Sequence, residues 1–256
     1  MSDPALAVTI RNLEFAYGNG HDSQPVPLFR EFSLGIAAST VVAVMGSSGS
    51  GKSTLAKIMV GILSPRLGQV EWGEQFRLPR EVIYTDQSPI NSVFPWQRVR
   101  QNLEWPLRKL GWAAGDRAER VDYLLRLFGL THRAGAFPAH ISGGELQRLA
   151  VARCLSWKPR CMILDESLSA LDRNTKETII AGLRTLAVNE SMTVVLITHN
   201  LTDALALADR CVILGQRPVQ ILGDHPIALP FPREENSSAY RTAQEPLIEI
   251  LRHGHL

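Results

Sequence analysis

Residues 46–53 read Gly-Ser-Ser-Gly-Ser-Gly-Lys-Ser and fit the phosphate-loop pattern G-x-x-x-x-G-K-[ST]. An apolar, strand-like run at 41–45 precedes them and a helix-like stretch at 54–63 follows, which is the setting this motif requires. The glycines let backbone N–H groups turn into one concavity, and the following helix directs its positive end at the same point. We therefore expect a nucleotide site whose phosphates are held by nine residues: Gly46, Ser47, Ser48, Gly49, Ser50, Gly51, Lys52, Ser53 and Thr54. Within it, Lys52 would reach the β- and γ-phosphates and the Ser53 hydroxyl would coordinate Mg²⁺.

Composition is that of an ordinary globular protein. The chain has 256 residues, of which 45% are hydrophobic and 20% charged, enough for one large domain or two small ones. A net charge of +2 gives no electrostatic reason to expect nucleic-acid binding. The apolar runs are far shorter than the roughly 18 residues of a membrane span, and the N-terminus shows no secretion signal. Cys154, Cys161 and Cys211 lack metal-like spacing, so we expect small buried thiols in a reducing compartment.

Strand-like and helix-like stretches alternate along the chain, which favours an α/β fold with a parallel sheet covered by helices on both faces. The expected strands are 6–17, 28–36, 40–45, 68–73, 81–85, 161–164, 193–198, 211–214 and 219–222. A helical block at 97–157 sits inside the alternation like an inserted subdomain, and further helices are expected at 174–187 and 201–208. We place one domain at 6–223 and a tail at 224–256 that is Pro-rich and then helical at 245–252.

The run Cys161-Met-Ile-Leu-Asp165-Glu166 is an apolar strand that ends in two carboxylates. Ligands of open parallel sheets bind in the crevice at the carboxyl ends of the strands. Asp165 is therefore expected to hold Mg²⁺, directly or through water, and Glu166 to act as the general base that polarises the attacking water.

Ser142-Gly-Gly-Glu145 precedes an amphipathic helix and has the spacing of a capping box. A capping box explains Ser142 and Glu145 but not two glycines in the first turn, where glycine lowers helix stability. Close approach of a phosphate to the backbone would explain them.

In combination, the phosphate loop, the Ser-Gly-Gly helix start and the apolar strand ending in Asp-Glu resemble the ATP-binding subunit of an ABC transporter, over roughly residues 6–223. The resemblance implies a phosphate-loop (RecA-like) parallel core with an N-terminal antiparallel β subdomain and the inserted helical subdomain. It also implies an ATPase that uses ATP and Mg²⁺ and dimerises around ATP. Four residues of one copy would complete the phosphate site of the other: Ser142, Gly143, Gly144 and Glu145.

The same resemblance implies roles for four further residues. Tyr17 would stack on the adenine ring, and His199 would sense the γ-phosphate. Gln87 would contact Mg²⁺ and the attacking water and would link the site to a membrane partner. Asp172 closes the Ser169–Asp172 loop, which would cross the dimer interface.

Two segments resemble the ATPases of nitrate, sulfonate and taurine importers: the stretch after Gln87 that contains Phe94-Pro-Trp96, and Arg217-Pro-Val-Gln-Ile221. This branch implies membrane permease subunits, an extracytoplasmic substrate-binding protein and a peripheral position on the cytoplasmic face of the inner membrane. We hypothesise that one or more of Trp96, Trp105 and Trp112 line a groove for a short permease helix.

Three alternatives remain open. The chain could serve an exporter or lipid-trafficking system, it could be a soluble ABC ATPase that acts on DNA or ribosomes, or it could be a nucleotide sensor without catalysis. Glu166 and His199 argue against the sensor.

Two positions depart from the family's usual pattern. Ser167 stands where proline is usual, which frees φ and is expected to loosen the placement of Glu166 and slow hydrolysis. Glu145 stands where glutamine is more frequent and would put a negative charge near the phosphate of the other copy. No catalytic position is lost, so we expect an active ATPase. The six other histidines, His253 and His255 among them, suggest no metal site.

Overall fold

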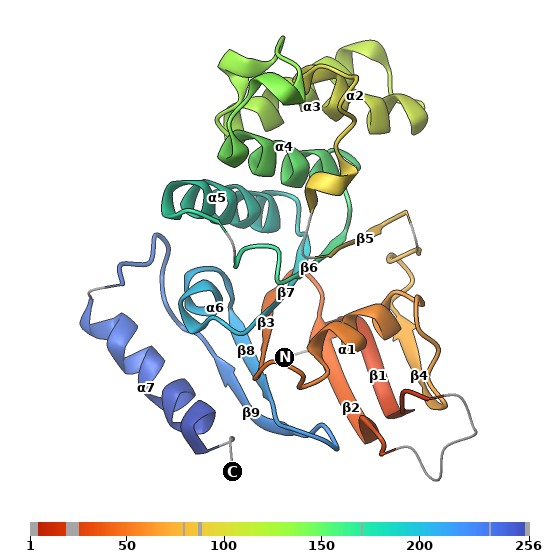
Figure 1. Cartoon of the computed structure of the whole chain (residues 1–256), viewed down its shortest axis with the longest axis vertical. Coiled ribbons are helices and arrows are strands. Elements are labelled where there is room, and N and C mark those ends of the chain that lie inside the picture. Colours follow the sequence, from red (N-terminus) through yellow and green to blue (C-terminus); the bar gives the residue numbers. More distant parts are fainter. Residues whose placement is uncertain are drawn as a thin grey trace.

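The structure of the chain, a computed structural model, describes residues 5–18, 26–78, 80–86, 89–169, 171–235 and 237–253. Its strands form two sheets, and helices cover them (Figure 1). The predicted α/β class is confirmed.

The smaller sheet has three strands in the order β2-β1-β4 and is antiparallel throughout. Its strands are β1 (Leu6–Phe15), β2 (Phe29–Ala37) and β4 (Leu67–Trp72). Gly68, at the start of β4, has a φ of 84°, and a Cβ atom there would lie 2.4 Å from the carbonyl oxygen of Asn12 in β1. Only glycine therefore lets the two strands approach this closely. The N-terminal antiparallel subdomain implied by the resemblance is confirmed.

The larger sheet has six strands in the order β5-β6-β7-β3-β8-β9. Its strands are β3 (Val41–Met45), β5 (Val82–Thr85), β6 (Cys161–Asp165), β7 (Thr193–Thr198), β8 (Arg210–Leu214) and β9 (Ile221–Pro226). The first five run parallel and β9 runs antiparallel to β8. We expected the last strand at 219–222, but it begins at Ile221 and continues to Pro226, so the domain boundary placed at 223 falls inside it.

Both faces of the larger sheet are buried, as β3 illustrates. Val41, Ala43 and Met45 point into one hydrophobic cluster, which also takes residues from the helices between residues 99 and 253. Val42 and Val44 point into a second cluster, shared with the helix at Lys52–Met59 and the smaller sheet. Because side chains alternate along a strand, a strand covered on both sides becomes a continuous apolar run, and every residue of β3 is buried.

Seven α-helices and three 3₁₀ turns complete the described part of the chain. The helices are α1 (Lys52–Met59), α2 (Val99–Lys109), α3 (Ala114–Leu127), α4 (Gly143–Ser156), α5 (Arg173–Asn189), α6 (Leu201–Leu207) and α7 (Ser238–His253). The 3₁₀ turns are η1 (Pro89–Ser92), η2 (Thr131–Arg133) and η3 (Pro138–His140). The block predicted at 97–157 consists of α2, α3 and α4, which lie together at one end of the molecule, beyond α5 (Figure 1). None of the helices in the described ranges is long and apolar enough to cross a membrane.

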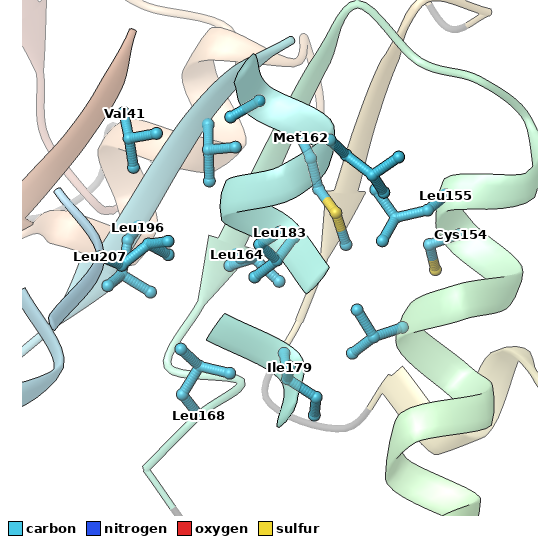
Figure 2. Close-up of a cluster of buried hydrophobic side chains, with 14 of the residues drawn as sticks. Val41, Cys154, Leu155, Met162, Leu164, Leu168, Ile179, Leu183, Leu196 and Leu207 are labelled. Atoms are coloured by element: carbon cyan, nitrogen blue, oxygen red, sulfur yellow. The ribbon is translucent and has the colours of Figure 1, made fainter. Parts of the chain in front are cut away.

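Side chains of α4 and α5 pack against β6 and β7 in the first cluster (Figure 2). Leu155, Met162, Leu183 and Leu196 are fully buried there. Cys154, Cys161 and Cys211 are buried free thiols, as predicted. Burial raises the pKa of the Cys211 thiol to about 12, so it remains protonated at neutral pH.

The tail is part of this core. Helix α7 begins at Ser238, earlier than the predicted 245, and contacts α6 and β9. Ile227, Tyr240 and Leu247 are at most 5% exposed and belong to the first cluster. The segment after β8 is therefore joined to the domain in two ways: β9 pairs with β8, and apolar side chains of the segment pack into the first cluster.

Candidate nucleotide site

The phosphate loop joins β3 to α1 through backbone conformations that favour glycine. Gly46 has a φ of 155° and Gly51 a φ of 85°. A Cβ atom on Gly46 would lie 2.6 Å from both the carbonyl oxygen of Leu214 and Ser50 Oγ, so the position has no room for a side chain. The loop thus curls tightly at the carboxyl end of β3, between β7 and β8.

Lys52 opens α1 and turns its side chain back over the loop. Its ammonium donates hydrogen bonds to the carbonyl oxygens of Gly46 at 2.9 Å and Ser47 at 2.8 Å. Burial lowers the pKa of Lys52, while the nearby carboxylates of Glu166 and Asp165 act to raise it. The loop therefore combines an ammonium group with the free N–H groups of a helix start, an arrangement that attracts phosphate.

Asp165 ends β6 and accepts one hydroxyl hydrogen bond on each carboxylate oxygen. Ser53 Oγ donates to Oδ1 at 2.8 Å, and the Tyr84 hydroxyl donates to Oδ2 at 2.9 Å. Burial, followed by the bond to Asp165, raises the pKa of Tyr84 well above its ordinary value. Ser53 and Asp165, predicted to share one metal ion, are thus in direct contact. Tyr84 was not predicted, since its only signal was a place on β5, the strand beside β6.

Glu166 and His199 follow the ends of β6 and β7, which are neighbouring parallel strands. His199 Nδ1 lies 3.5 Å from Glu166 Oε1. Glu166 has a φ of 51°, which is uncommon for a residue with a side chain. Its N–H donates to the carbonyl oxygen of Ile197 at 2.9 Å, and its own carbonyl accepts from Ser169 Oγ at 2.8 Å. Backbone bonds on both sides therefore hold this carboxylate next to the phosphate loop.

Ser167 follows Glu166 and is held by its hydroxyl. Ser167 Oγ donates to the carbonyl oxygen of Asp86 at 2.8 Å and lies 3.1 Å from Thr85 Oγ1. Ser167 and Thr85 are both at most 5% exposed. The serine therefore ties down the segment that we expected it to loosen. Sequence reasoning missed Thr85, because nothing local connects it to a residue 82 positions further along.

Ser142 and Glu145 form the predicted capping box at the start of α4. Glu145 N donates to Ser142 Oγ at 3.2 Å, and Ser142 N donates to Glu145 Oε2 at 2.7 Å. Glu145 Oε1 lies 3.0 Å from both Arg133 Nε and His132 Nε2. These bonds, led by the one from the Ser142 backbone, lower the pKa of Glu145 to about 2. The Glu145 carboxylate, which we expected near a phosphate of the other copy, makes its hydrogen bonds within its own chain.

The two glycines of this motif differ in their surroundings. A Cβ atom on Gly144 would lie 2.4 Å from Thr175 Oγ1 in α5, so packing between the two helices requires glycine there. A Cβ atom on Gly143 would have no neighbour within 4 Å, so packing inside the chain gives no reason for this glycine. Helix α4 packs on α2, α3, α5 and η1, whereas α1 packs on β6 and β7. One chain therefore does not bring the Ser142–Glu145 motif onto its own phosphate loop.

The remaining predicted site residues take different positions. The Tyr17 side chain is 54% exposed, and its hydroxyl lies 2.8 Å from Thr54 Oγ1. Asp172 caps α5 by accepting a bond from Thr175 N at 3.0 Å, and this bond lowers the pKa of its carboxyl group. Gln87 lies outside the described residues.

Aromatic side chains gather on the surface of the helical block. Trp96 is 70% exposed and stacks on Phe94, with ring centroids 5.2 Å apart. Phe94 meets Trp105 edge to face at 5.1 Å, and Arg153 lies 4.2 Å from the Phe94 centroid. Trp96 and Trp105 line a hollow of about 280 Å³, whereas Trp112 lines a separate one of about 250 Å³. Two of the three tryptophans therefore share one surface.

A larger cavity, about 700 Å³, lies away from the phosphate loop, between α5 and residues 231–235. Arg184 and Arg233 each place a guanidinium group 4.1 Å from the ring centroid of Phe231 at this cavity. None of the residues predicted to bind the nucleotide lines it.

The model of a family described as "ABC transporter" matches residues 29–169. The aliphatic sulfonates import ATP-binding protein SsuB of Rhodopseudomonas palustris is 35% identical over 250 residues, which cover 98% of this chain and 85% of the relative. The protein named SsuB 1 from Xanthomonas axonopodis pv. citri is 34% identical, over 90% of this chain and 92% of the relative.

Solved structures agree with these relatives. The dimeric structure of MJ0796, described as a bacterial ABC transporter cassette, has a TM-score of 0.70 and 26% identity, over 86% of this chain and 98% of the other. A second dimeric structure of this cassette, in a post-hydrolysis state with ADP and Pi, has a TM-score of 0.69. The cbiO1 protein of Clostridium perfringens shares the fold, with a TM-score of 0.76 at 22% identity and 98% coverage of both chains.

Proposed function

The chain belongs to the ABC transporter family as an ATP-binding, ATP-hydrolysing subunit, and on this premise we propose that it powers the import of an aliphatic sulfonate or a related small anion. One observation supports ATP hydrolysis most strongly. The phosphate loop, Asp165, Glu166 and His199 meet at the carboxyl ends of neighbouring strands, so a nucleotide and a water would meet there too. The choice of cargo rests on the names of the sulfonate-import relatives.

Binding of ATP follows from the loop and its flanks. Backbone N–H groups between Gly46 and Thr54 would surround the β- and γ-phosphates, and Lys52 would exchange its two carbonyl partners for phosphate oxygens. Tyr17 has an exposed ring close to the start of α1, held by its bond to Thr54, and would stack on the adenine ring.

The donors near the loop fit Mg²⁺. Ser53 Oγ and the Asp165 carboxylate are hard oxygen ligands that already converge. Within the described ranges, no group of three or more His, Cys, Asp or Glu side chains could hold a metal ion. A hydroxyl and one carboxylate suit an ion that retains waters and substrate phosphates in its coordination shell. When bound, Mg²⁺ neutralises charge on the phosphates. Gln87 is proposed as a further ligand from its sequence position alone.

Hydrolysis requires a base beside the γ-phosphate. Glu166 would accept a proton from the attacking water, since its carboxylate lies next to the loop and its backbone is fixed on both sides. His199 lies 3.5 Å away and would orient the same water or the γ-phosphate. Phosphoryl transfer depends mainly on positioning and electrostatic stabilisation, and these two side chains would supply the positioning of the water.

A second copy would complete the site. Gly143 begins α4, and a Cβ atom on it would meet nothing within 4 Å, so a phosphate of another copy would have access to its N–H group. Glu145 would serve this motif by capping α4, with its charge held by Arg133 and His132. Asp172, on the exposed loop before α5, would lie at the dimer interface.

A permease would dock on the aromatic surface formed by Phe94, Trp96 and Trp105. An exposed Trp on a rigid base of stacked rings is typical of binding hot spots. A peripheral position on the cytoplasmic side of the membrane and a substrate-binding protein outside it would complete the importer.

The test is to tag the chain in its native cell, purify it from gently solubilised membranes and identify its partners by mass spectrometry. We expect one permease and one extracytoplasmic binding protein, and we expect cells lacking the chain to lose growth on an alkanesulfonate as sole sulfur source. Recovery with ribosomes or DNA would contradict the transport function. Normal growth on sulfonates, with the permease still bound, would contradict only the cargo.

A further inference from the structure

Ser167 and Thr85 join two parts of the site that are far apart in the sequence. Ser167 directly follows Glu166, the proposed base, and Asp86 directly precedes Gln87, the proposed link to the permease. The hydroxyl of Ser167 has a single hydrogen, which the 2.8 Å distance assigns to the carbonyl oxygen of Asp86. The Thr85 hydroxyl lies 3.1 Å from Ser167 Oγ and 3.3 Å from the carbonyl oxygen of Ile163, and the shorter distance favours donation to Ser167 Oγ.

The surroundings make these bonds hard to replace. Ser167 is 4% exposed and Thr85 is 5% exposed, so water has little access to either hydroxyl. A buried polar group without a partner is costly, which favours the two hydroxyls staying paired. Leu168, the next residue, is 1% exposed in the first cluster and fixes the other side of Ser167.

Glu166 needs such support. Its left-handed φ of 51° is a conformation that persists when neighbouring contacts determine it. One contact is its N–H to Ile197, and another is its carbonyl to Ser169. Ser167 adds a third restraint, from the end of β5, and it does so through a hydroxyl that the proline usual at this position lacks.

We propose that Ser167, with Thr85, is a positioning residue that holds the Glu166 carboxylate in its hydrolytic place and ties that place to the segment entering Gln87. The inference rests on the proposed role of Glu166. The hydroxyl pair would act on the rate of hydrolysis and leave ATP binding, which depends on the phosphate loop, nearly unchanged. It would also make hydrolysis respond to any movement of residues 85 and 86, which accept or donate these bonds.

The test compares Ser167→Ala with Ser156→Ala by steady-state phosphate release at varied MgATP. Ser156 is a matched control, because its hydroxyl is also buried and also donates to a backbone carbonyl, that of Arg153 at 2.6 Å, but in α4. We expect Ser167→Ala to lower kcat about ten- to hundredfold, the range that small misplacements of reacting groups produce, with KM within about twofold. Ser156→Ala should leave both constants within about twofold of the wild type.

Two further measurements separate positioning from general damage. Thr85→Val removes the hydrogen bonds of Thr85 to Ser167 and Ile163 but leaves the bond from Ser167 to Asp86, so it should lower kcat less than Ser167→Ala does, though by more than about twofold. The double variant should be no slower than Ser167→Ala. In a Glu166→Gln background, Ser167→Ala should change the residual rate less than about twofold, because the group it positions is already gone.

Three results would overturn the inference: an unchanged kcat in Ser167→Ala, equal losses in Ser167→Ala and Ser156→Ala, or a full additional loss on top of Glu166→Gln. Should Ser167→Ala fail to fold, Thr85→Val decides on the same criteria. An inactive wild-type chain would overturn the proposed function itself, which distinguishes the two failures.

Discussion

At the scale of single residues, the arrangement around Glu166 makes the sharpest prediction. Glu166→Gln keeps the shape of the side chain and removes its ability to accept a proton. We expect phosphate release to fall by about 10²–10⁴-fold, the usual contribution of a general base, while ATP still binds. Glu177→Gln, on the exposed face of α5, serves as the control and should hydrolyse ATP normally. A wild-type rate in Glu166→Gln would show that another group activates the water.

Tyr84 belongs to the candidate site but was not predicted from the sequence. Its hydroxyl holds Asp165 Oδ2, so Tyr84→Phe frees the carboxylate to turn away from Ser53. Loss of a residue that orients a metal ligand commonly weakens metal binding by about 10- to 100-fold. We expect the Mg²⁺ concentration for half-maximal ATPase activity to rise by about tenfold. Tyr123→Phe, in α3, should leave this Mg²⁺ concentration unchanged. An equal Mg²⁺ requirement in both variants would show that Tyr84 does not position the metal ligand.

At the scale of elements, the start of α4 depends on Glu145. The folded-state pKa of about 2 lies below the ordinary 4.5, so the carboxylate stabilises the fold fully above about pH 4.5. This stabilisation is lost as the pH falls toward 2. Glu145→Ala should lower the free energy of unfolding by about 1–3 kcal/mol at pH 7, since it removes charge-assisted hydrogen bonds.

Urea unfolding at pH 7 and pH 3 checks this prediction. The difference between Glu145→Ala and the wild type should be smaller at pH 3, where part of the native carboxylate's advantage has gone. The exposed Glu119→Gln should match the wild type at both pH values. A difference that stays constant with pH would assign the effect to packing and not to charge.

The elements also show what the sequence can and cannot predict. The capping box was readable because its partners lie three residues apart, whereas Arg133 and His132 reach Glu145 only after α3 and α4 have packed. Strand β9 was predicted too short. Residues 223–226 read Gly-Asp-His-Pro, a poor strand sequence, and pairing with β8 overrides that preference.

The candidate site also contains residues that a local pattern predicts and residues that only the fold brings together. The phosphate loop, Asp165 and the Ser142–Glu145 motif were recognisable because each is a short local pattern. Tyr84, Thr85 and Ser167 come together only because β5 and β6 are neighbours in the sheet, which no local pattern encodes. The direction of the Glu145 carboxylate was also beyond the sequence, since it is decided by basic residues of the preceding turn.

At the scale of the whole molecule, the tail stabilises the domain. Leu247 is 1% exposed against the first cluster, so Leu247→Ala should lower the free energy of unfolding by about 2–5 kcal/mol. Denaturant unfolding, with Val188→Ala at a 64% exposed position as control, measures the difference. Equal stability of the two variants would mean that α7 contributes nothing to the core.

In the assembled ATPase, we expect two chains to share each ATP. Gly143 is suited to test it, because a Cβ atom there would meet nothing within 4 Å in its own chain. Aspartate at a helix start is tolerated or favoured, so Gly143→Asp should fold normally. Its negative charge would repel a phosphate that approaches from a second copy.

The most direct measurement is the molar mass of Glu166→Gln by light scattering, with and without MgATP, compared with the Glu166→Gln, Gly143→Asp double variant. The 28.3 kDa chain should double its mass with ATP, and the double variant should bind ATP yet stay single. Dimerisation of the double variant to the same extent, or an ATP-bound Glu166→Gln chain that remains a monomer, would contradict a shared site.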